Sequence, residues 1–207
     1  MNFTCNEPLE NFSGDFLKFD KFLPLFSKID KLRQEGTEPY HPILIAIDGN
    51  CAAGKSTLAA RLKSVYGCNV FTMDDFFLKT SQKTVERLNE PGGNVDYERF
   101  LAEVIRPLLK CQPFEYRAFD CKTQKLSEPT LVRPTPINII EGAYSLHPLF
   151  SDVYDIKVFL GIDEKEQCRR LMARNAALYD KFINEWMPLE NKYFEAYDIR
   201  LICDFVF

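Results

Sequence analysis

The chain has 207 residues, of which 46% are hydrophobic and 27% charged, and its formal net charge is −4. This length suits one globular domain with a sizeable core, and the negative balance argues against nucleic-acid binding through bulk electrostatics. No apolar run approaches the roughly 18 residues of a membrane span, and the N-terminus lacks the basic start and apolar core of a secretory signal. We expect a cytoplasmic protein without membrane or nucleic-acid partners, and the composition leaves homo-oligomers open.

The seven cysteines are odd in number and scattered, and no CxxC pair occurs. This arrangement predicts neither a zinc site nor a disulfide scaffold but reduced thiols, as in a cytoplasm. Cys51 stands out because it lies in a glycine-containing loop. It is either a small residue that fits there or a thiol that faces a ligand.

The first predicted element is an amphipathic helix over residues 14–34, where apolar residues recur in steps of three and four. Pro24 either kinks this helix or starts its second half, and Gly36 follows its end. We expect residues 1–39 to form an N-terminal arm and helix, and residues 40–207 to form the main domain.

Beyond residue 40, strands and helices alternate, and several strands are wholly apolar. This pattern predicts an α/β fold with a parallel sheet and helices on both faces. The expected elements are a strand 43–47, a loop 48–55, a helix 56–65, a strand 69–73, a polar loop 79–97, a helix 97–110, a hairpin within 114–133, strands 137–140 and 153–160, helices 163–175 and 179–199, and a strand 201–207.

The loop between the first strand and helix carries the pattern GxxxxGK[ST], in a strand–loop–helix context. In this pattern, backbone N–H groups and the helix N-terminus bind phosphate oxygens, the lysine reaches the β- and γ-phosphates, and the hydroxyl ligates Mg²⁺. We therefore expect a nucleoside triphosphate, ATP or GTP, together with Mg²⁺. The expected nucleotide-binding residues are Gly49, Asn50, Cys51, Ala52, Ala53, Gly54, Lys55, Ser56 and Thr57, with Lys55 also catalytic and Ser56 also a metal ligand.

Two apolar strands end in carboxylates, at Asp74-Asp75 and at Glu141. Ligands of parallel sheets bind at the carboxyl ends of the strands, so Asp74 could accept a proton from an attacking hydroxyl or hold water around the metal, and Glu141 could lie near Mg²⁺. The alternatives are a solvated strand end or a helix N-cap at Asp74 and Asp75, and a strand-end carboxylate paired with a surface lysine at Glu141.

The predicted helix 163–175 carries Arg169, Arg170 and Arg174. Arg170 and Arg174 are four residues apart and share a helical face, so they could clamp phosphates. A solvated face paired with nearby glutamates explains the same spacing equally well.

The ordered motifs GNCAAGKST, MDDFF, PGGNVDYERF, FEYRAFD and IIEGAYSLHP resemble the uridine kinase family, within the phosphoribulokinase and pantothenate kinase group. The resemblance covers about residues 40 to 207. It implies a P-loop NTPase fold with a small substrate-side hairpin and an arginine-bearing lid, and an ATP-dependent kinase that phosphorylates a hydroxyl of a nucleoside or a similar small alcohol.

The resemblance also implies roles for single residues. It makes Asp74 the catalytic base, which also contacts the acceptor. It implies that Asp96 binds the sugar hydroxyls and that the Tyr116 ring packs near the base. It also implies that Glu141 lies beside the metal and that Arg170 and Arg174 are lid arginines that bind ATP.

The sequence also departs from this family. Residues 117–121 lack the histidine that reads the pyrimidine edge, Gln167 stands where an arginine is usual, and residues 176–180 lack a late lid arginine. Arg117 either replaces a base-reading residue, favours an anionic acceptor, or is a surface charge of the hairpin. Phosphorylation of a uridine- or cytidine-like acceptor is the main hypothesis, and the alternatives are a pantothenate- or sugar-like acceptor and a non-catalytic nucleotide-binding regulator.

Overall fold

The computed structural model describes residues 20–36 and 41–207. Residues 20–36 belong with Phe207 to one compact unit, and residues 41–206 belong to a second, larger unit.

The small unit contains a short 3-10 turn, η2 (Asp20–Phe22), and helix α2 (Leu23–Glu35). Pro24 lies in the first turn of α2, where a residue without an N–H is tolerated. Gly36 follows the last helical residue at φ 66°. Within the described residues, Pro24 therefore marks a helix start, and the earlier part of the predicted helix 14–34 lies outside them.

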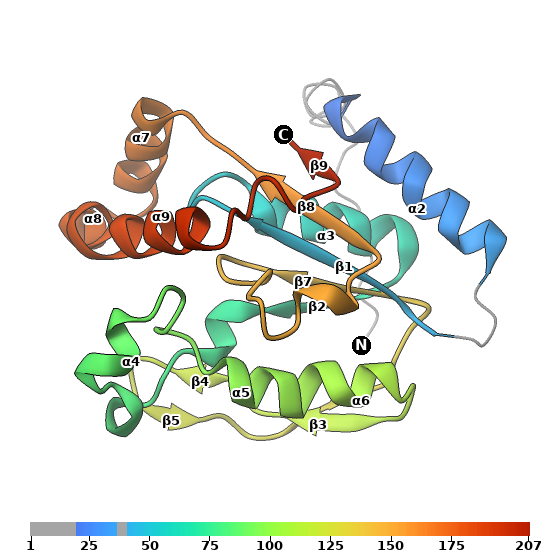
Figure 1. Ribbon diagram of the computed structural model, residues 1–207, viewed down its shortest axis with the longest axis horizontal. Helices are drawn as coiled ribbons and strands as arrows, with labels where there is room; N and C mark the ends of the chain where they lie inside the picture. The colour runs from blue at the N-terminus through green and yellow to red at the C-terminus, as the bar shows by residue number, and fades with distance from the viewer. Residues whose placement is uncertain (1–19, 37–40) are drawn as a thin grey trace, which may run out of the picture. The chain divides into compact units, whose positions relative to one another are not determined.

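The large unit is built on a five-stranded sheet in the order β2-β7-β1-β8-β9. All four pairings between neighbouring strands are parallel, as the apolar strands predicted. Every residue of the central strand β1 is buried. The strands are β1 (Ile43–Gly49), β2 (Asn69–Thr72), β7 (Ile137–Glu141), β8 (Ile156–Leu160) and β9 (Phe205–Val206), as Figure 1 shows.

Helices flank the sheet on both faces because side chains alternate along a strand. Leu44 and Ala46 of β1 belong to a core cluster with residues of α5, η5, α6 and α9, whereas α3 contacts β1, β2 and β7 from the other side (Figure 1). These helical segments are α3 (Lys55–Tyr66), α5 (Tyr97–Phe100), η5 (Leu101–Ile105), α6 (Arg106–Leu109) and α9 (Met187–Ala196). The fold class expected from the sequence is confirmed.

Both long predicted helices contain a π-helical segment. In the first, η5 joins α5 to α6. In the second, α8 (Tyr179–Lys181) leads through the π-helical η8 (Phe182–Trp186) into α9. Each π segment ends two residues before a proline, Pro107 or Pro188. A proline lacks the N–H that the carbonyl four residues earlier would accept, and a π turn is a way to absorb that gap in a helix.

Several expected boundaries were wrong. The polar segment 79–97 is not only loop, because it contains η4 (Thr80–Gln82) and α4 (Val85–Asn89), the latter capped by the Thr84 hydroxyl. The expected hairpin exists as β3 (Phe114–Tyr116) paired with β6 (Thr130–Val132), and it encloses a second antiparallel pair, β4 (Phe119–Asp120) with β5 (Lys125–Leu126).

The last part of the chain also differs in its limits. The expected strand 153–160 is shorter because η6 (Ser151–Val153) precedes β8, and the final strand comprises only β9. The arginine-bearing helix is α7 (Glu164–Arg174), and a short turn, η7 (Ala176–Leu178), joins it to α8.

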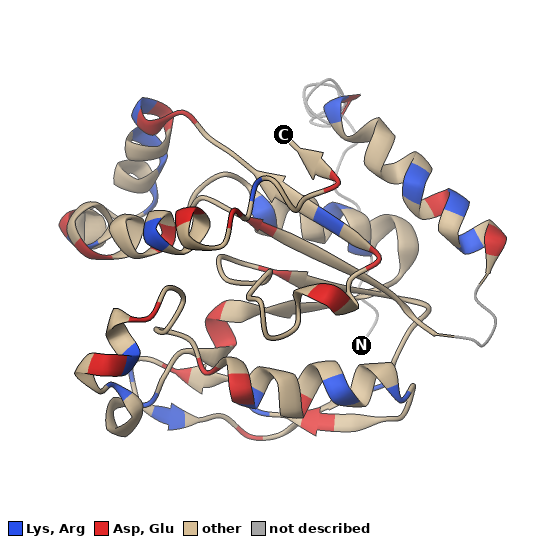
Figure 2. Ribbon diagram, viewed as in Figure 1, with Lys and Arg blue, Asp and Glu red and all other residues tan. Residues whose placement is uncertain are grey.

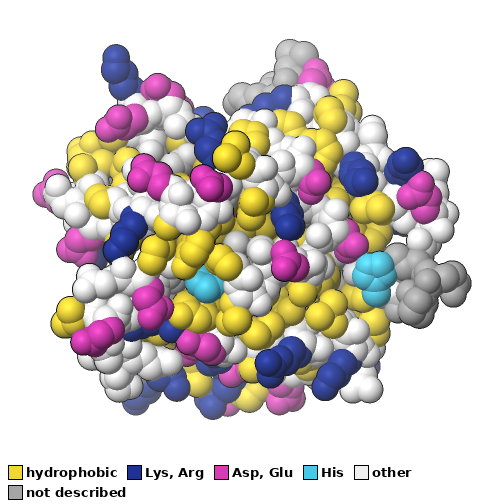
Figure 3. Space-filling model, viewed as in Figure 1, with side chains coloured by type: hydrophobic (Ala, Val, Ile, Leu, Met, Phe, Trp, Pro, Cys, Tyr) yellow, Lys and Arg dark blue, Asp and Glu magenta, His cyan; other side chains and the backbone are white. Residues whose placement is uncertain are grey.

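Within the described chain, no helix is both long enough and apolar enough to span a membrane. On the face shown in Figure 3, acidic and basic side chains are interspersed. This face therefore carries no broad field of one sign.

Candidate functional site

The phosphate-binding pattern forms the turn between β1 and α3. Gly49 has φ 133°, and a Cβ added to it would lie 2.1 Å from the carbonyl oxygen of Leu160 in β8, so only glycine fits beside this strand. Gly54, at φ 103°, is the N-cap of α3 and provides no side-chain cap. The first N–H groups of α3 are therefore open to an anionic ligand.

Lys55 is the first residue of α3 and curls back over the loop. Its Nζ donates to the carbonyl oxygens of Gly49, at 2.7 Å, and Asn50, at 2.9 Å. Because an ammonium group has three donors, one N–H remains for a phosphate oxygen. The loop carbonyls thus fix the ammonium group at the site where phosphate would bind.

A cavity of about 850 Å³ lies against this loop and collects most of the residues singled out in the sequence. The loop residues that line it are Cys51, Ala52, Gly54, Lys55, Ser56 and Thr57. Asp74, Glu141, Arg170 and Arg174 also line it, from three further segments of the chain. Gly49, Asn50 and Ala53 complete the loop without lining the cavity.

Glu141, at the end of β7, is paired with hydroxyl groups. It is 4% exposed, and its carboxylate accepts hydrogen bonds from Ser56 Oγ at 3.2 Å and from Thr72 Oγ1 at 3.0 Å. Burial raises its pKa, and the Thr72 hydroxyl, Lys55 and the Ser56 hydroxyl oppose the rise.

The oxygen donors of Ser56 and Glu141 fit Mg²⁺, which takes oxygen ligands and is commonly held by one or two protein groups together with substrate phosphates. No group of three or more acidic, histidine or cysteine side chains suited to a metal occurs among the described residues. The fit therefore depends on a metal that is shared with phosphates.

Asp74 lies in the 3-10 turn η3 (Met73–Phe76) that follows β2, and its carboxylate opens onto the cavity. Burial raises the pKa of Asp74, whereas the positive charges of Lys55 and Arg174 lower it. A carboxylate with a raised pKa, exposed to a cavity, is suited to accept a proton near neutral pH.

Helix α7 brings its arginines to the loop, and Figure 2 marks the positions of its basic residues in blue along the ribbon. Arg170 donates through Nε to Glu166 at 2.7 Å and through a terminal nitrogen to the Ala52 carbonyl at 3.1 Å. Arg169 pairs with Glu166 as well, but it does not line the cavity. The glutamate pairing is therefore present on this helix, and Arg170 also lies where it could contact a phosphate.

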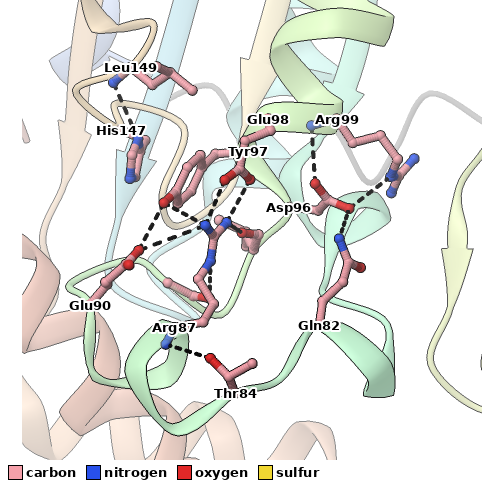
Figure 4. A network of polar contacts seen from close by, with 12 residues as sticks. Gln82, Thr84, Arg87, Glu90, Asp96, Tyr97, Glu98, Arg99, His147 and Leu149 are labelled. Atoms are coloured by element: carbon pink, nitrogen blue, oxygen red, sulfur yellow. Dashed lines mark hydrogen bonds and ion pairs between the residues drawn. The ribbon is translucent and has the colours of Figure 1, made fainter.

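Asp96 does not line this cavity. It is 5% exposed, and its side chain caps α5 by accepting the Arg99 N–H at 3.1 Å and also accepts Gln82 Nε2 at 2.8 Å (Figure 4). These partners hold its carboxylate, so its expected role toward sugar hydroxyls remains a prediction.

Tyr116 and Arg117 do not line the cavity either. The Tyr116 hydroxyl donates to Asp75 at 3.4 Å, and its ring stacks on Phe76 with centroids 5.7 Å apart. Arg117 is exposed and donates through Nε to the Ser127 carbonyl at 2.5 Å. Their expected contacts with the acceptor also stay predictions.

Gln167 has a defined place although it departs from the arginine expected there. It is 3% exposed, and its Nε2 donates to the Cys51 carbonyl at 3.0 Å and to Cys51 Sγ at 3.1 Å. Burial, followed by the neighbouring Glu190, raises the pKa of the Cys51 thiol to about 12. Cys51 thus borders the cavity as a protonated thiol held by Gln167.

Sequence reasoning missed one wall of the cavity, formed by Phe77, Asn94 and Tyr144. Tyr144 has φ 74°, which is strained for a bulky residue and is characteristic of functional sites. Burial raises the pKa of its hydroxyl, while a hydrogen bond with Asn94 acts the other way. The motif EGAYSLHP contains Tyr144, but nothing in the motif indicates its backbone conformation.

Sequence reasoning also missed three residues of the last long helix, Phe182, Trp186 and Glu190, which line the cavity. The Phe182 and Trp186 rings pack edge to face, with centroids 4.5 Å apart. An aromatic-rich amphipathic helix usually indicates core packing, so its pattern does not indicate that this helix reaches a ligand site.

The chain is similar in sequence and in fold to several proteins named as small-molecule kinases. No protein-family model matches the chain. A uridine kinase of Clostridium perfringens is 24% identical over 170 residues, covering 74% of this chain and 82% of that protein. A phosphoribulokinase of Synechocystis is 28% identical over 146 residues, covering 65% of this chain and 42% of that protein.

Solved structures agree on the fold. A protein of Bacillus stearothermophilus described as a possible uridine kinase superposes with a TM-score of 0.64 at 22% identity, covering 89% of this chain and all of that one. A D-glycerate 3-kinase of Cryptococcus neoformans superposes with a TM-score of 0.57 at 17% identity, covering 81% of this chain and 84% of that one. The resemblance to uridine kinase-like proteins, expected from the motifs, is confirmed in sequence and in fold.

Proposed function

We propose that this chain is an ATP-dependent phosphotransferase that phosphorylates a hydroxyl of a uridine- or cytidine-like nucleoside or a similar small alcohol. The observation that carries the proposal is one cavity lined by the phosphate loop, Asp74, Glu141, Arg170 and Arg174. The similarity to uridine kinases and to a phosphoribulokinase supports it.

In this proposal the chain's residues position and neutralise charge. When bound, ATP with Mg²⁺ supplies the phosphoryl group and the metal that balances its charge. Lys55 contacts phosphate oxygens, Ser56 and Glu141 hold the metal side, and Arg170 and Arg174 offset charge on the transferred group. Because phosphoryl transfer requires little covalent help, positioning supplies most of the rate.

Asp74 is the proposed base. Its carboxylate opens onto the cavity and has a raised pKa, so it can accept the proton of an acceptor hydroxyl. The neighbouring Asp75 does not line the cavity and instead accepts the Tyr116 hydroxyl. Asp75→Asn is therefore a matched control for Asp74→Asn within the same turn.

The acceptor in this proposal lies between Asp74 and the wall of Phe77, Asn94 and Tyr144. Aromatic faces with one amide suit a flat ring that carries polar edges. The exposed position of Arg117 gives no support to an anionic acceptor, which leaves a neutral alcohol as the favoured class. This arrangement favours a nucleoside over pantothenate.

The decisive experiment measures ADP release from ATP and Mg²⁺ with uridine, cytidine, other nucleosides, sugars and pantothenate, each against a reaction without acceptor. Release stimulated by a nucleoside, and lowered at least ~10²-fold in Asp74→Asn but not in Asp75→Asn, is the expected result. Stimulation by sugars or pantothenate alone would replace the nucleoside with that class. ATP binding without release under any acceptor would instead favour a regulator.

A further inference from the structure

The helix that follows the arginine-bearing lid places a carboxylate on the phosphate loop. Glu190 of α9 is 7% exposed, and its Oε2 accepts the backbone N–H of Cys51 at 2.9 Å. Glu190 also lines the cavity that holds Lys55 and Asp74. A backbone amide of a phosphate loop is a group that ordinarily serves anions, and here a side chain of the protein takes it.

We propose that Glu190 is an internal anion that competes with the polyphosphate of the nucleotide for the phosphate loop, and so sets the affinity of the site for that ligand. This inference rests on the proposed function, because it assumes that the loop binds a triphosphate. It adds a residue from the last helix to the determinants of nucleotide binding.

Two physical effects act in the same direction. The carboxylate occupies the Cys51 amide, which a ligand oxygen cannot share without displacing it. Burial raises the pKa of Glu190, whereas Lys55 and the Cys51 N–H oppose the rise. In its ionised form the carboxylate also places negative charge in the cavity wall, where water screens it less than on an open surface. Both effects oppose a bound polyphosphate, and neither depends on the base or sugar of a nucleotide.

The surroundings of Glu190 define which groups respond to it. The titratable groups that act on it or are acted on by it are Lys55 of α3, Cys51 of the loop, Asp48 of β1 and Tyr144 after β7. Lys55 is the one cation in this set. Its ammonium group is held by the carbonyls of Gly49 and Asn50. Because Glu190 and a bound phosphate would both be attracted to this one ammonium group, the carboxylate weakens its attraction for the phosphate.

A purely structural role predicts a different outcome. If Glu190 only fixes the Cys51 peptide, the amide oxygen of Glu190→Gln can still accept the Cys51 N–H and the affinity stays unchanged. If Glu190 competes with phosphate, the same substitution removes the charge and lets a ligand oxygen replace a weaker acceptor.

The test measures dissociation constants of ATP, tripolyphosphate and adenosine for the whole chain, for Glu190→Gln and for Glu195→Gln. Glu195 lies on the same helix and is exposed, so its variant makes the same chemical change away from the cavity. Trp186 is the chain's one tryptophan and lines the cavity, so its fluorescence reports binding without a label.

The expected result is binding of ATP and of tripolyphosphate that is on the order of tenfold tighter in Glu190→Gln, with adenosine and Glu195→Gln unchanged. Equal or weaker polyphosphate binding in Glu190→Gln, while the unsubstituted chain binds ATP, overturns the inference and leaves the proposed function in place. Failure of the unsubstituted chain to bind ATP, or ATP binding that Lys55→Ala leaves intact, overturns both.

Discussion

Asp48, the residue immediately before the phosphate loop, should make stability depend on pH in an unusual direction. It is fully buried. One carboxylate oxygen accepts the Gly49 N–H at 2.7 Å, and the other accepts the Leu146 N–H at 3.0 Å and the Tyr193 hydroxyl at 2.8 Å. Burial raises the pKa of Asp48 to about 6 even though these hydrogen bonds and Lys55 oppose the rise.

The direction and size of the effect follow from this shift. The folded chain holds a proton on Asp48 more tightly than the unfolded chain, so the stability it contributes is fully present below pH about 4 and is lost as the pH rises through about 6. A shift of about two pKa units corresponds to about 3 kcal/mol, a large share of the ~5–15 kcal/mol typical of a domain.

The measurement is the free energy of unfolding by urea between pH 4.5 and 7.5, for the unsubstituted chain and for Asp48→Asn. Asparagine does not titrate, so the stability of the variant relative to the unsubstituted chain should rise by about 2 kcal/mol across this range, since part of the full effect lies below pH 4.5. The variant also loses an acceptor for one backbone N–H, at a cost of about 1–3 kcal/mol that does not depend on pH. The prediction therefore concerns how this stability difference changes with pH, and not its value at any one pH.

Taking a difference between the two proteins is necessary because His147 acts in the opposite direction. Burial, followed by Arg87, lowers the pKa of His147 to about 4, so its contribution is present above pH about 6.5 and is lost as the pH falls through about 4. That contribution cancels between the two proteins.

A second variant, Tyr193→Phe, removes a donor to Asp48 and should move the transition to higher pH. A difference that stays flat from pH 4.5 to 7.5 would refute the raised pKa of Asp48.

Three further predictions concern the loop and the base. Gly49→Ala should lower the free energy of unfolding by at least ~2 kcal/mol in the same urea assay, because its Cβ would meet the Leu160 carbonyl. Gly67 has φ 63° and open space around it, so Gly67→Ala should lower it by only about 1 kcal/mol. Equal losses in the two variants would contradict the close approach at Gly49. At pH 8, iodoacetamide should alkylate Cys51 far more slowly than the exposed Cys121, as measured by peptide mass spectrometry. Alkylation of Cys51 should be faster in Glu190→Gln, because Glu190 raises the pKa of the Cys51 thiol. Comparable rates at the two thiols would show that Cys51 is not protected. The rate of phosphoryl transfer should fall with decreasing pH through a pKa above the ordinary aspartate value of about 3.9, because burial raises that of Asp74; a profile flat down to pH 4 would remove Asp74 as the titrating base.

The sequence located the residues whose positions depend on local geometry. A phosphate loop needs only its own glycines and the strand and helix beside it, and the carboxyl ends of parallel strands lie along one edge of the sheet. Asp74 and Glu141 were therefore predicted to lie near Lys55, and all three line one cavity.

The sequence did not locate residues whose positions depend on packing between distant segments. Asp96, Tyr116 and Arg117 were assigned from motif position alone, and their side chains have partners away from the cavity. Gln167 appeared as the loss of an arginine, whereas its amide holds the Cys51 carbonyl. An amide at this position can bind the loop backbone without adding charge, and no spacing rule distinguishes that role from a plain substitution.

The last helix shows how a local irregularity produces a site that periodicity alone does not predict. Phe182, Trp186 and Glu190 are four residues apart, and in an α-helix of about 3.6 residues per turn each such step overshoots a full turn, so three residues drift around the helix. The first step, however, crosses the π-helical η8, where i to i+5 hydrogen bonds give more residues per turn, and four residues undershoot a turn. The two deviations offset each other, so all three side chains can face the same cavity. Since Pro188 follows this π turn by two residues and lacks the N–H that a regular helix would use there, the proline contributes to the alignment that brings Glu190 to the phosphate loop.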